Sequence, residues 1–173
     1  YVTPATGGPV GTTGGQFFFF RSSTANIGPL TVQNNTNSTI ITPISITPSV
    51  YNYPGPPSGS FICSITPQIL NISIRPKPVA TATAPNSTIC NNTSAGIAVN
   101  GNIIDAPMTF AWTRNNTVNV TGANNGNSGN ILPGNSFTIP TILNNTTTIT
   151  QTVIFTITPS SNGCTGSQIT ITI

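Results

Sequence analysis

Side chains that could carry out catalysis are scarce in this chain of 173 residues. It contains no His, four Lys or Arg residues and a single acidic residue, Asp105. General acid–base catalysis needs two ionisable groups with separated pKa values, and a Cys nucleophile needs a neighbouring base. A hard cation such as Ca²⁺ needs several carboxylate oxygens. We therefore expect a protein that is not an enzyme and that holds no metal and no cofactor.

The basic residues are scattered and do not form a run. They are Arg21, Arg75, Lys77 and Arg114, and the formal net charge is +3. Nucleic-acid binding requires a row of cations that neutralise phosphates, so no nucleic-acid partner is expected. No run approaches the ~18 apolar residues of a membrane span, so we expect no membrane insertion. The first residues show no signal-peptide pattern, which favours a mature fragment or a segment of a longer protein.

Asparagines in Asn-x-Ser/Thr sequons are the most numerous candidate modification sites. Two interpretations stay open, namely polar residues of turns and edge strands, or attachment sites for glycans. The candidate glycosylation sites are Asn34, Asn37, Asn71, Asn86, Asn92, Asn115, Asn119 and Asn144, and the sequence also has sequons at Asn91 and Asn145.

Clustered aromatic residues are the candidate interaction residues. In an alternating strand, two rings of the Phe17–Phe20 run point into a sandwich and two point outward. Either the long loop Tyr51–Ser60 covers the outer rings, or they form an exposed patch for a neighbouring repeat, subunit or surface. The candidate interface residues are Phe17, Phe18, Phe19, Phe20, Tyr51 and Tyr53. Trp112 is expected in the core.

The composition and the alternation of residues predict β-strands. Thr, Ile, Val and Asn dominate, with 16 Gly and 16 Pro, a balance that favours short strands joined by turns. In the stretch Phe155–Ile173, two alternating runs flank Asn162-Gly-Cys, which predicts a β-hairpin. The pattern recurs over Ile44–Ile74, with Cys63 between its runs. Aligning Pro48 with Pro159 extends the similarity toward Tyr1 and predicts tandem repeats.

The second copy contains roughly seven expected short strands, which is typical of a β-sandwich. The expected strands are Val79–Ala84, Ala95–Val99, Met108–Thr113, a short one at Val118 and Val120, Phe137–Ile139, Thr148–Ile157 and Gln168–Ile173. The predicted domains are residues 1–75, a repeat lacking its N-terminal strands, and residues 79–173, a complete repeat. Residues 76–78 form the predicted Pro-rich linker between them.

Taken in order, five segments of the second copy resemble one PKD-like repeat, an immunoglobulin-like module found in large surface proteins of Bacteroidota. The segments are Pro78–Ala84, Thr88–Cys90, Phe110–Thr113, Phe155–Cys164 and Ile169–Ile173. The resemblance covers residues 78–173, and residues 1–75 resemble the later two-thirds of another copy. It implies an all-β fold of tandem immunoglobulin-like β-sandwiches and a secreted or bacterial cell-surface location. It leaves the ligand open.

The repeat also suggests a pairing for the three cysteines. Cys90 follows the first strand of the complete repeat and Cys164 lies in its last hairpin, so a disulfide between them is predicted. Cys63 occupies the position of Cys164, and its predicted partner lies upstream of Tyr1. The alternative is a bond from Cys63 to another subunit. The cysteines themselves favour an oxidising, extracellular compartment.

The function that this organisation favours is a structural repeat of a large adhesin or extracellular filament. A sandwich without its early strands exposes sheet edges, so either the missing strands are present but unresolved, or a neighbouring chain donates one by strand addition. The expected partners are neighbouring repeats or copies of the chain itself, and surface glycans. The alternatives are a carbohydrate- or surface-binding module, and a spacer domain of a secreted polysaccharide-degrading enzyme.

Overall fold

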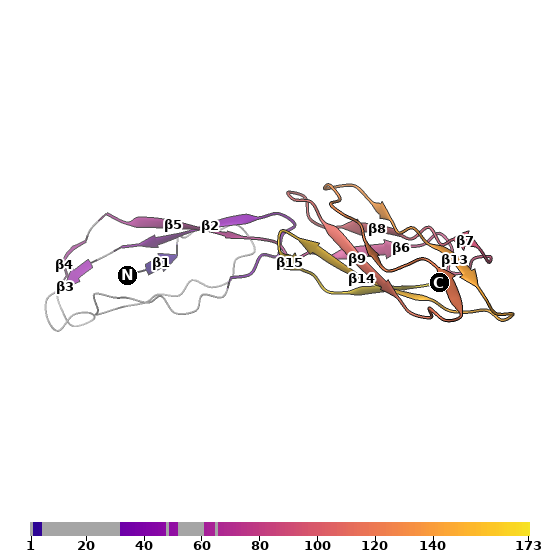
Figure 1. The fold of residues 1–173 in the computed structure, drawn as a ribbon. Helices are drawn as coiled ribbons and strands as arrows, with labels where there is room; N and C mark the ends of the chain where they lie inside the picture. The colour runs from indigo at the N-terminus through magenta and orange to yellow at the C-terminus, as the bar shows by residue number, and fades with distance from the viewer. Residues whose placement is uncertain (1, 5–31, 48, 52–60, 65) are drawn as a thin grey trace. The chain divides into compact units, whose positions relative to one another are not determined.

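The computed structural model describes residues 2–4, 32–47, 49–51, 61–64 and 66–173. The chain divides into two compact units, Tyr1–Arg75 (unit 1) and Pro76–Ile173 (unit 2). Each is considered by itself (Figure 1). All regular secondary structure in the described ranges is β-strand, so the all-β prediction is confirmed. The same ranges contain no helix long and apolar enough to cross a membrane.

Unit 1 contains a three-stranded antiparallel sheet in the order β1-β2-β5. Its strands are β1 (Val2–Pro4), β2 (Ile40–Ile46) and β5 (Gln68–Ile74). Ile44 pairs with Leu70, so the two alternating runs are neighbouring antiparallel strands. A separate antiparallel pair, β3 (Ser49–Tyr51) and β4 (Phe61–Ser64), lies between β2 and β5 in the chain.

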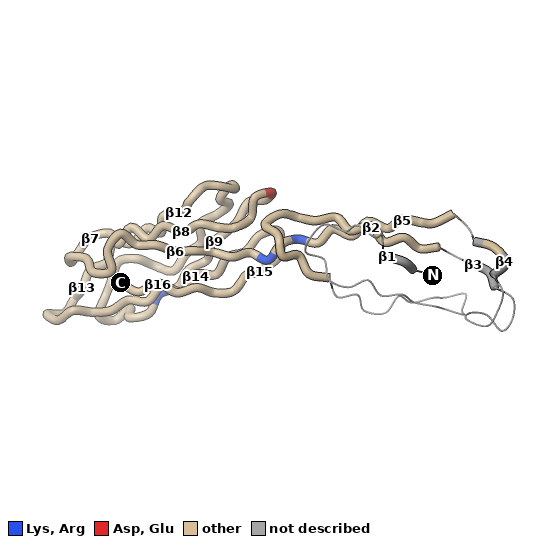
Figure 2. Tube along the Cα trace, turned by 180° about the vertical axis from the view of Figure 1, so that it is seen from behind, with Lys and Arg blue, Asp and Glu red and all other residues tan. Residues whose placement is uncertain are grey.

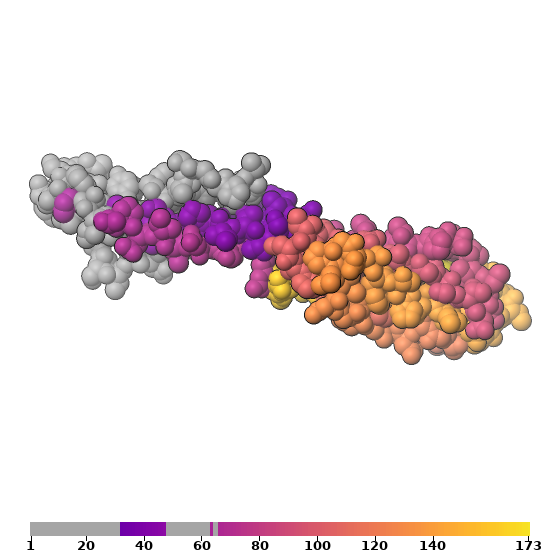
Figure 3. All heavy atoms as spheres, turned by 90° about the horizontal axis from the view of Figure 1, so that it is seen from above, coloured from indigo at the N-terminus to yellow at the C-terminus, as the bar shows by residue number. Residues whose placement is uncertain are grey.

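Unit 2 has one large sheet built around β14 and two smaller sheets (Figure 1). In the large sheet, β11 (Gly126–Asn127), β9 (Thr109–Arg114) and β14 (Ile154–Ser161) are neighbours, and both β15 (Cys164–Thr165) and β16 (Ile169–Thr172) pair with β14. The second sheet contains β12 (Phe137–Thr138), β8 (Ala98–Gly101) and β6 (Ala80–Thr83). The third contains β10 (Val120–Gly122), β13 (Ile142–Asn145) and β7 (Thr93–Ser94). In Figure 3 the orange segment that includes β11 and β12 covers much of the visible face of this unit.

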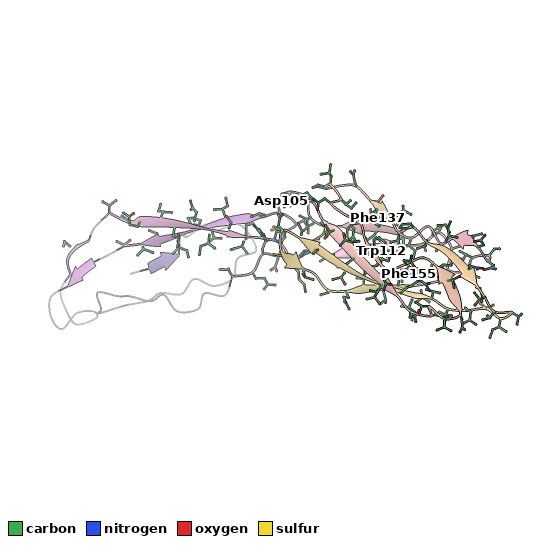
Figure 4. All side chains as sticks on the ribbon, viewed as in Figure 1. Asp105, Trp112, Phe137 and Phe155 are labelled. Carbon is green, nitrogen blue, oxygen red and sulfur yellow. The ribbon has the colours of Figure 1, made fainter. Side chains whose placement is uncertain are left out.

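The core of unit 2 follows from the alternation of side chains along its central strands. In β14 every second residue from Phe155 onward is buried, as expected for a strand that packs one face on a core. Trp112 of β9 is 6% exposed, and its indole N–H donates to the Asn124 carbonyl oxygen at 2.9 Å. Its ring lies 5.4 Å from that of Phe137, tilted by 34°, and Phe155 lies in the same cluster (Figure 4). The prediction that Trp112 is a core residue is confirmed.

The hairpin predicted near Cys164 is present. Ser161 pairs with Cys164, and the two-residue turn between them is Asn162-Gly163 with φ values of 48° and 81°. Two consecutive positive φ values are typical of the type I′ turn, which matches the twist of the flanking strands and favours Asn-Gly. A local sequence signal is sufficient for this element.

Three of the other expected strands begin later in the structure than the sequence predicts. The strand expected from Thr148 begins only at Ile154, because the preceding segment forms a side-chain-bonded loop that is described below. The strand expected from Ala95 begins at Ala98, after Gly96 adopts a φ of 59° that interrupts an extended backbone. Val118 is 85% exposed, and the strand expected there, β10, begins at Val120.

Candidate functional site

Two of the described cations, Arg114 and Lys77, act as structural groups. The Arg114 guanidinium donates to four carbonyl oxygens of the segment that follows it, those of Asn115, Asn116, Val120 and Ala123. Lys77 donates to Ser167 Oγ at 3.0 Å. Figure 2 shows the described charged positions along an otherwise uncharged trace. Within the described ranges, no three His, Cys, Asp or Glu residues come close enough to bind a metal ion.

The three cysteines are unpaired in this structure. Cys90 lines a cavity together with Val153 and Ile173, at the end of unit 2 where β14 begins. Cys164 follows Ser161, at the other end of β14. Figure 1 shows β7 and β15 at opposite ends of the unit.

The separation of Cys90 and Cys164 corrects the predicted disulfide. The eight residues of β14 span on the order of 20 Å. A disulfide requires Cα atoms within about 7 Å of one another. Cys90 and Cys164 therefore do not form a disulfide within one folded unit. The predicted partner of Cys63 lies outside the chain.

The asparagines of the sequons have different environments. Asn34 is 9% exposed, and its Nδ2 atom donates to the carbonyl oxygens of Ser38 and Ile74, both at 2.8 Å. Both hydrogens of the atom that would carry a glycan are thus engaged, so the folded chain has no room for a glycan at Asn34. The other seven candidates are exposed or half-buried, and their glycosylation stays a prediction: Asn37, Asn71, Asn86, Asn92, Asn115, Asn119 and Asn144.

The candidate aromatic interface falls mostly outside the described residues. Phe17, Phe18, Phe19, Phe20 and Tyr53 lie in the ranges that the structure does not describe, and Tyr51 is described only by its backbone pairing with Phe61. The aromatic interface therefore stays a prediction.

A loop centred on Asn145 is a feature that sequence reasoning missed. Asn145 Oδ1 accepts from the backbone N–H of Thr147 at 2.9 Å, and its Nδ2 donates to the Ile149 carbonyl oxygen at 2.8 Å. Thr147 Oγ1 lies 2.8 Å from Asn145 Oδ1 and 3.0 Å from the Ile149 oxygen, so its single proton can serve either acceptor. The side chain thus takes the backbone partners that a strand would need, which is a physical reason why β14 starts late.

Unit 1 contains the same loop. Asn34 Oδ1 accepts from the Thr36 N–H at 2.9 Å, and its Nδ2 donates to the Ser38 carbonyl oxygen at 2.8 Å. Thr36 Oγ1 lies 2.7 Å from Asn34 Oδ1 and 2.8 Å from the Ser38 oxygen. Asn34 aligns with Asn145 in the register that places Pro48 under Pro159. The shared register could have distinguished these two asparagines from the other sequons.

Two further features agree between the units in this register. Val50 pairs with Cys63 in unit 1, and Ser161, the residue aligned with Val50, pairs with Cys164 in unit 2. In addition, β2 lies between β1 and β5, as β14 lies between β9 and β16. Both cysteines therefore occupy the same cross-strand position of a hairpin.

Two cavities of unit 2 are the candidate binding sites. The first, of about 440 Å³, lies beside the Asn145 loop, and a second of about 390 Å³ lies at the β14–β15 hairpin. Side chains of the first are apolar, hydroxyl or amide groups together with Cys90. Those of the second are Ser, Thr, Asn and Pro. Such walls bind by hydrogen bonds and apolar contact, without ionised groups to activate a substrate.

Comparison with known proteins agrees with the resemblance seen in the sequence. The family model of the PKD-like domain matches residues 87–173, which include β7 to β16. No curated protein and no solved structure matches the chain. PKD-like domains are immunoglobulin-like modules, generally non-catalytic and typically extracellular. With half of its length matched by this model, the chain belongs to the PKD-like domain family.

Proposed function

We propose that the chain consists of repeats of one PKD-like structural module in a secreted or cell-surface protein of the adhesin or filament type. The observation that carries this proposal is the Asn-x-Thr loop, which makes the same four contacts in both units. Family membership supports a structural or adhesive module. Residues 1–75 are the partial copy and residues 79–173 the complete one, joined at residues 76–78.

Composition alone is a weak explanation for the matching loops. Sequons are frequent in this Asn- and Thr-rich chain, but other sequons make other contacts. For example, Asn119 Nδ2 donates to the Gln151 side chain, and Asn115 Oδ1 accepts from the Ile154 N–H. The cysteine hairpins provide a second agreement in the same register. The matching Asn loops and the matching cysteine hairpins together favour a duplicated module.

The module works as a scaffold whose partners are neighbouring repeats and further copies of the chain. Its polar side chains form hydrogen bonds within the module, since the Asn34, Asn145 and Arg114 side chains donate to backbone carbonyl oxygens of their own unit. Extracellular location on a bacterial surface fits this family and the near absence of charge. Assembly by strand addition is one way in which such modules join.

Surface labelling and force measurements test the proposal. Antibodies raised against the chain should label intact cells of the source organism. When the chain is stretched between two marker domains, unit 2 should unfold in a single step that releases about 30 nm, at ~3.6 Å per residue. Labelling confined to permeabilised cells, or extension of unit 2 without a resolvable force step, would contradict a surface scaffold. Saturable binding on a glycan array would instead favour the carbohydrate-binding alternative.

A further inference from the structure

In unit 2, β9 pairs with β14 along one edge, and its other edge faces away from β14. The backbone groups of successive residues in an antiparallel strand point to opposite sides of the strand. Those that point away from β14 belong to Phe110, Trp112 and Arg114, and Met108 continues the row just ahead of the strand. If it were bare, such a row of N–H and C=O groups would pair with an extended segment of another chain.

A single segment, residues 125–131, covers this row. Met108 and Ile131 exchange two backbone hydrogen bonds of 2.9 and 2.8 Å, and Trp112 pairs with Gly126 of β11. The chain advances five residues from Gly126 to Ile131 and only four from Met108 to Trp112. The covering segment therefore contains one extra residue, which makes it a bulged strand.

Side-chain oxygens complete the cover on either side of the Gly126 pairing. Ser128 Oγ accepts from the Phe110 N–H at 2.9 Å and donates its own hydrogen to the Gly129 carbonyl oxygen at 2.7 Å. The Ser128 N–H donates to the Phe110 carbonyl oxygen at 3.0 Å. Asn125 Oδ1 accepts from the Arg114 N–H at 3.1 Å. Each outward position of the row thus has a partner inside unit 2.

The covering segment is itself a poor partner for a further strand. Its exposed residues are Asn125, Asn127, Gly129 and Asn130, and both Asn and Gly are depleted in strands. Gly129 has a φ of 66°, which interrupts the extended backbone that another strand would follow. Its N–H already donates to Asn127 Oδ1 at 2.9 Å. The bulged segment therefore ends the sheet on this side.

We propose that the segment 125–131 is an edge cover that prevents β9 from pairing with a strand of a second module of the same kind. This inference specifies the proposed scaffold role and rests on it, because repeats in one array are close together and similar in sequence. Exposed sheet edges are the places where strands of such neighbours would pair wrongly. Where copies join by strand addition, the joining strand therefore uses an edge other than that of β9.

The test removes both side-chain acceptors from the full chain in the double variant Asn125→Ala/Ser128→Ala. The two freed N–H groups gain partners when a second chain pairs with β9, so the dissociation constant measured by sedimentation equilibrium should fall about 5- to 100-fold relative to wild type. Amide hydrogen exchange of Phe110 and Arg114 should be fast in the dilute variant and slow in the concentrated variant. In the wild type it should not depend on concentration. Ser128→Ala alone should show the same change at Phe110 to a smaller extent.

Two further variants separate edge pairing from a loss of stability. Asn116→Ala removes amide hydrogen bonds to Gln151 and to the Thr152 carbonyl oxygen, which lie outside the edge cover, so it should leave association unchanged. Ala111→Lys, added to the double variant, should restore the wild-type dissociation constant. Ala111 is an exposed residue of β9, and a Lys on an edge strand opposes pairing with another chain.

Three results would overturn the inference. They are unchanged association of the double variant, equal association of Asn116→Ala, and association of the double variant that Ala111→Lys does not reduce. Any of them refutes the edge cover and leaves the scaffold role standing, because surface labelling and single-step unfolding test that role separately.

Discussion

Replacing Asn145 by Ala is the most direct test of the loop on which the repeat relationship rests. The substitution removes the acceptor for the Thr147 N–H and the donor to the Ile149 carbonyl oxygen. It also removes one of the two acceptors within reach of the Thr147 hydroxyl. The backbone of residues 145–149 then has to find its partners in water.

The size of the effect follows from the number of bonds and their exposure. Each net hydrogen bond contributes about 0.5–1.5 kcal/mol, and the substitution deletes two or three of them. Because Asn145 is half-buried, water restores part of this loss, and we expect the free energy of unfolding of unit 2 to fall by about 1–2 kcal/mol. For a unit of this size the melting temperature should fall by about 5–15 °C.

Thermal unfolding measured through Trp112 fluorescence gives the readout for unit 2, since the chain has one Trp and it is 6% exposed. Asn144→Ala is the matched control, because Asn144 is the neighbouring residue of β13 and its side chain makes no hydrogen bond in the described part of the chain.

The twin substitution in unit 1 provides a second comparison. Asn34→Ala deletes the same contacts and the additional bond to Ile74, at a residue that is 9% exposed. It should therefore cost more, about 2–3 kcal/mol, in the circular-dichroism transition of unit 1, and leave the Trp112 transition unchanged. The reasoning is refuted if Asn145→Ala and Asn144→Ala shift the Trp112 midpoint equally.

Three further predictions concern packing and the cysteines. Thr42→Val should stabilise unit 1 by about 1 kcal/mol in chemical denaturation, because Thr42 Oγ1 is the one buried side-chain polar atom without a partner among the described residues. Gly126→Ala should destabilise unit 2 by about 1–3 kcal/mol, since the added Cβ would lie 2.5 Å from Cζ2 of Trp112. Gly129→Ala is the control: no atom lies within 4 Å of its added Cβ, so it should lower the free energy of unfolding by less, despite its φ of 66°. Peptide mapping under non-reducing conditions should find no Cys90–Cys164 cross-link within a chain, and finding one would contradict the placement of these residues at opposite ends of unit 2.

The features predicted from the sequence are those that depend on neighbouring residues. The Asn162-Gly163 turn and the alternation along β14 are local signals, and both the hairpin and the buried face of Phe155 follow from them. The predicted Cys90–Cys164 disulfide was wrong because it required knowing which ends of distant strands lie together. No local sequence pattern specifies which strand ends meet. β14 starts late because the Asn145 side chain competes with the backbone for hydrogen bonds. The alternation of apolar and polar residues carries no information about such competition.

The near absence of charge makes sense once the hydrogen bonds of unit 2 are considered together. Neutral amide side chains, and not ion pairs, connect separate segments of unit 2. Asn145 closes one loop, Asn116 donates to the Thr152 carbonyl oxygen, and Asn115 accepts from the Ile154 N–H. Such bonds have no proton to lose between pH 5 and 8 and are little screened by salt. A module stabilised by neutral hydrogen bonds should keep its free energy of unfolding when pH and ionic strength change. Such changes occur outside cells, where we propose that this scaffold lies. Because the wild-type chain has no His, we expect its stability to change little between pH 5 and 8. Replacing these asparagines by Asp should make the stability of unit 2 depend on pH.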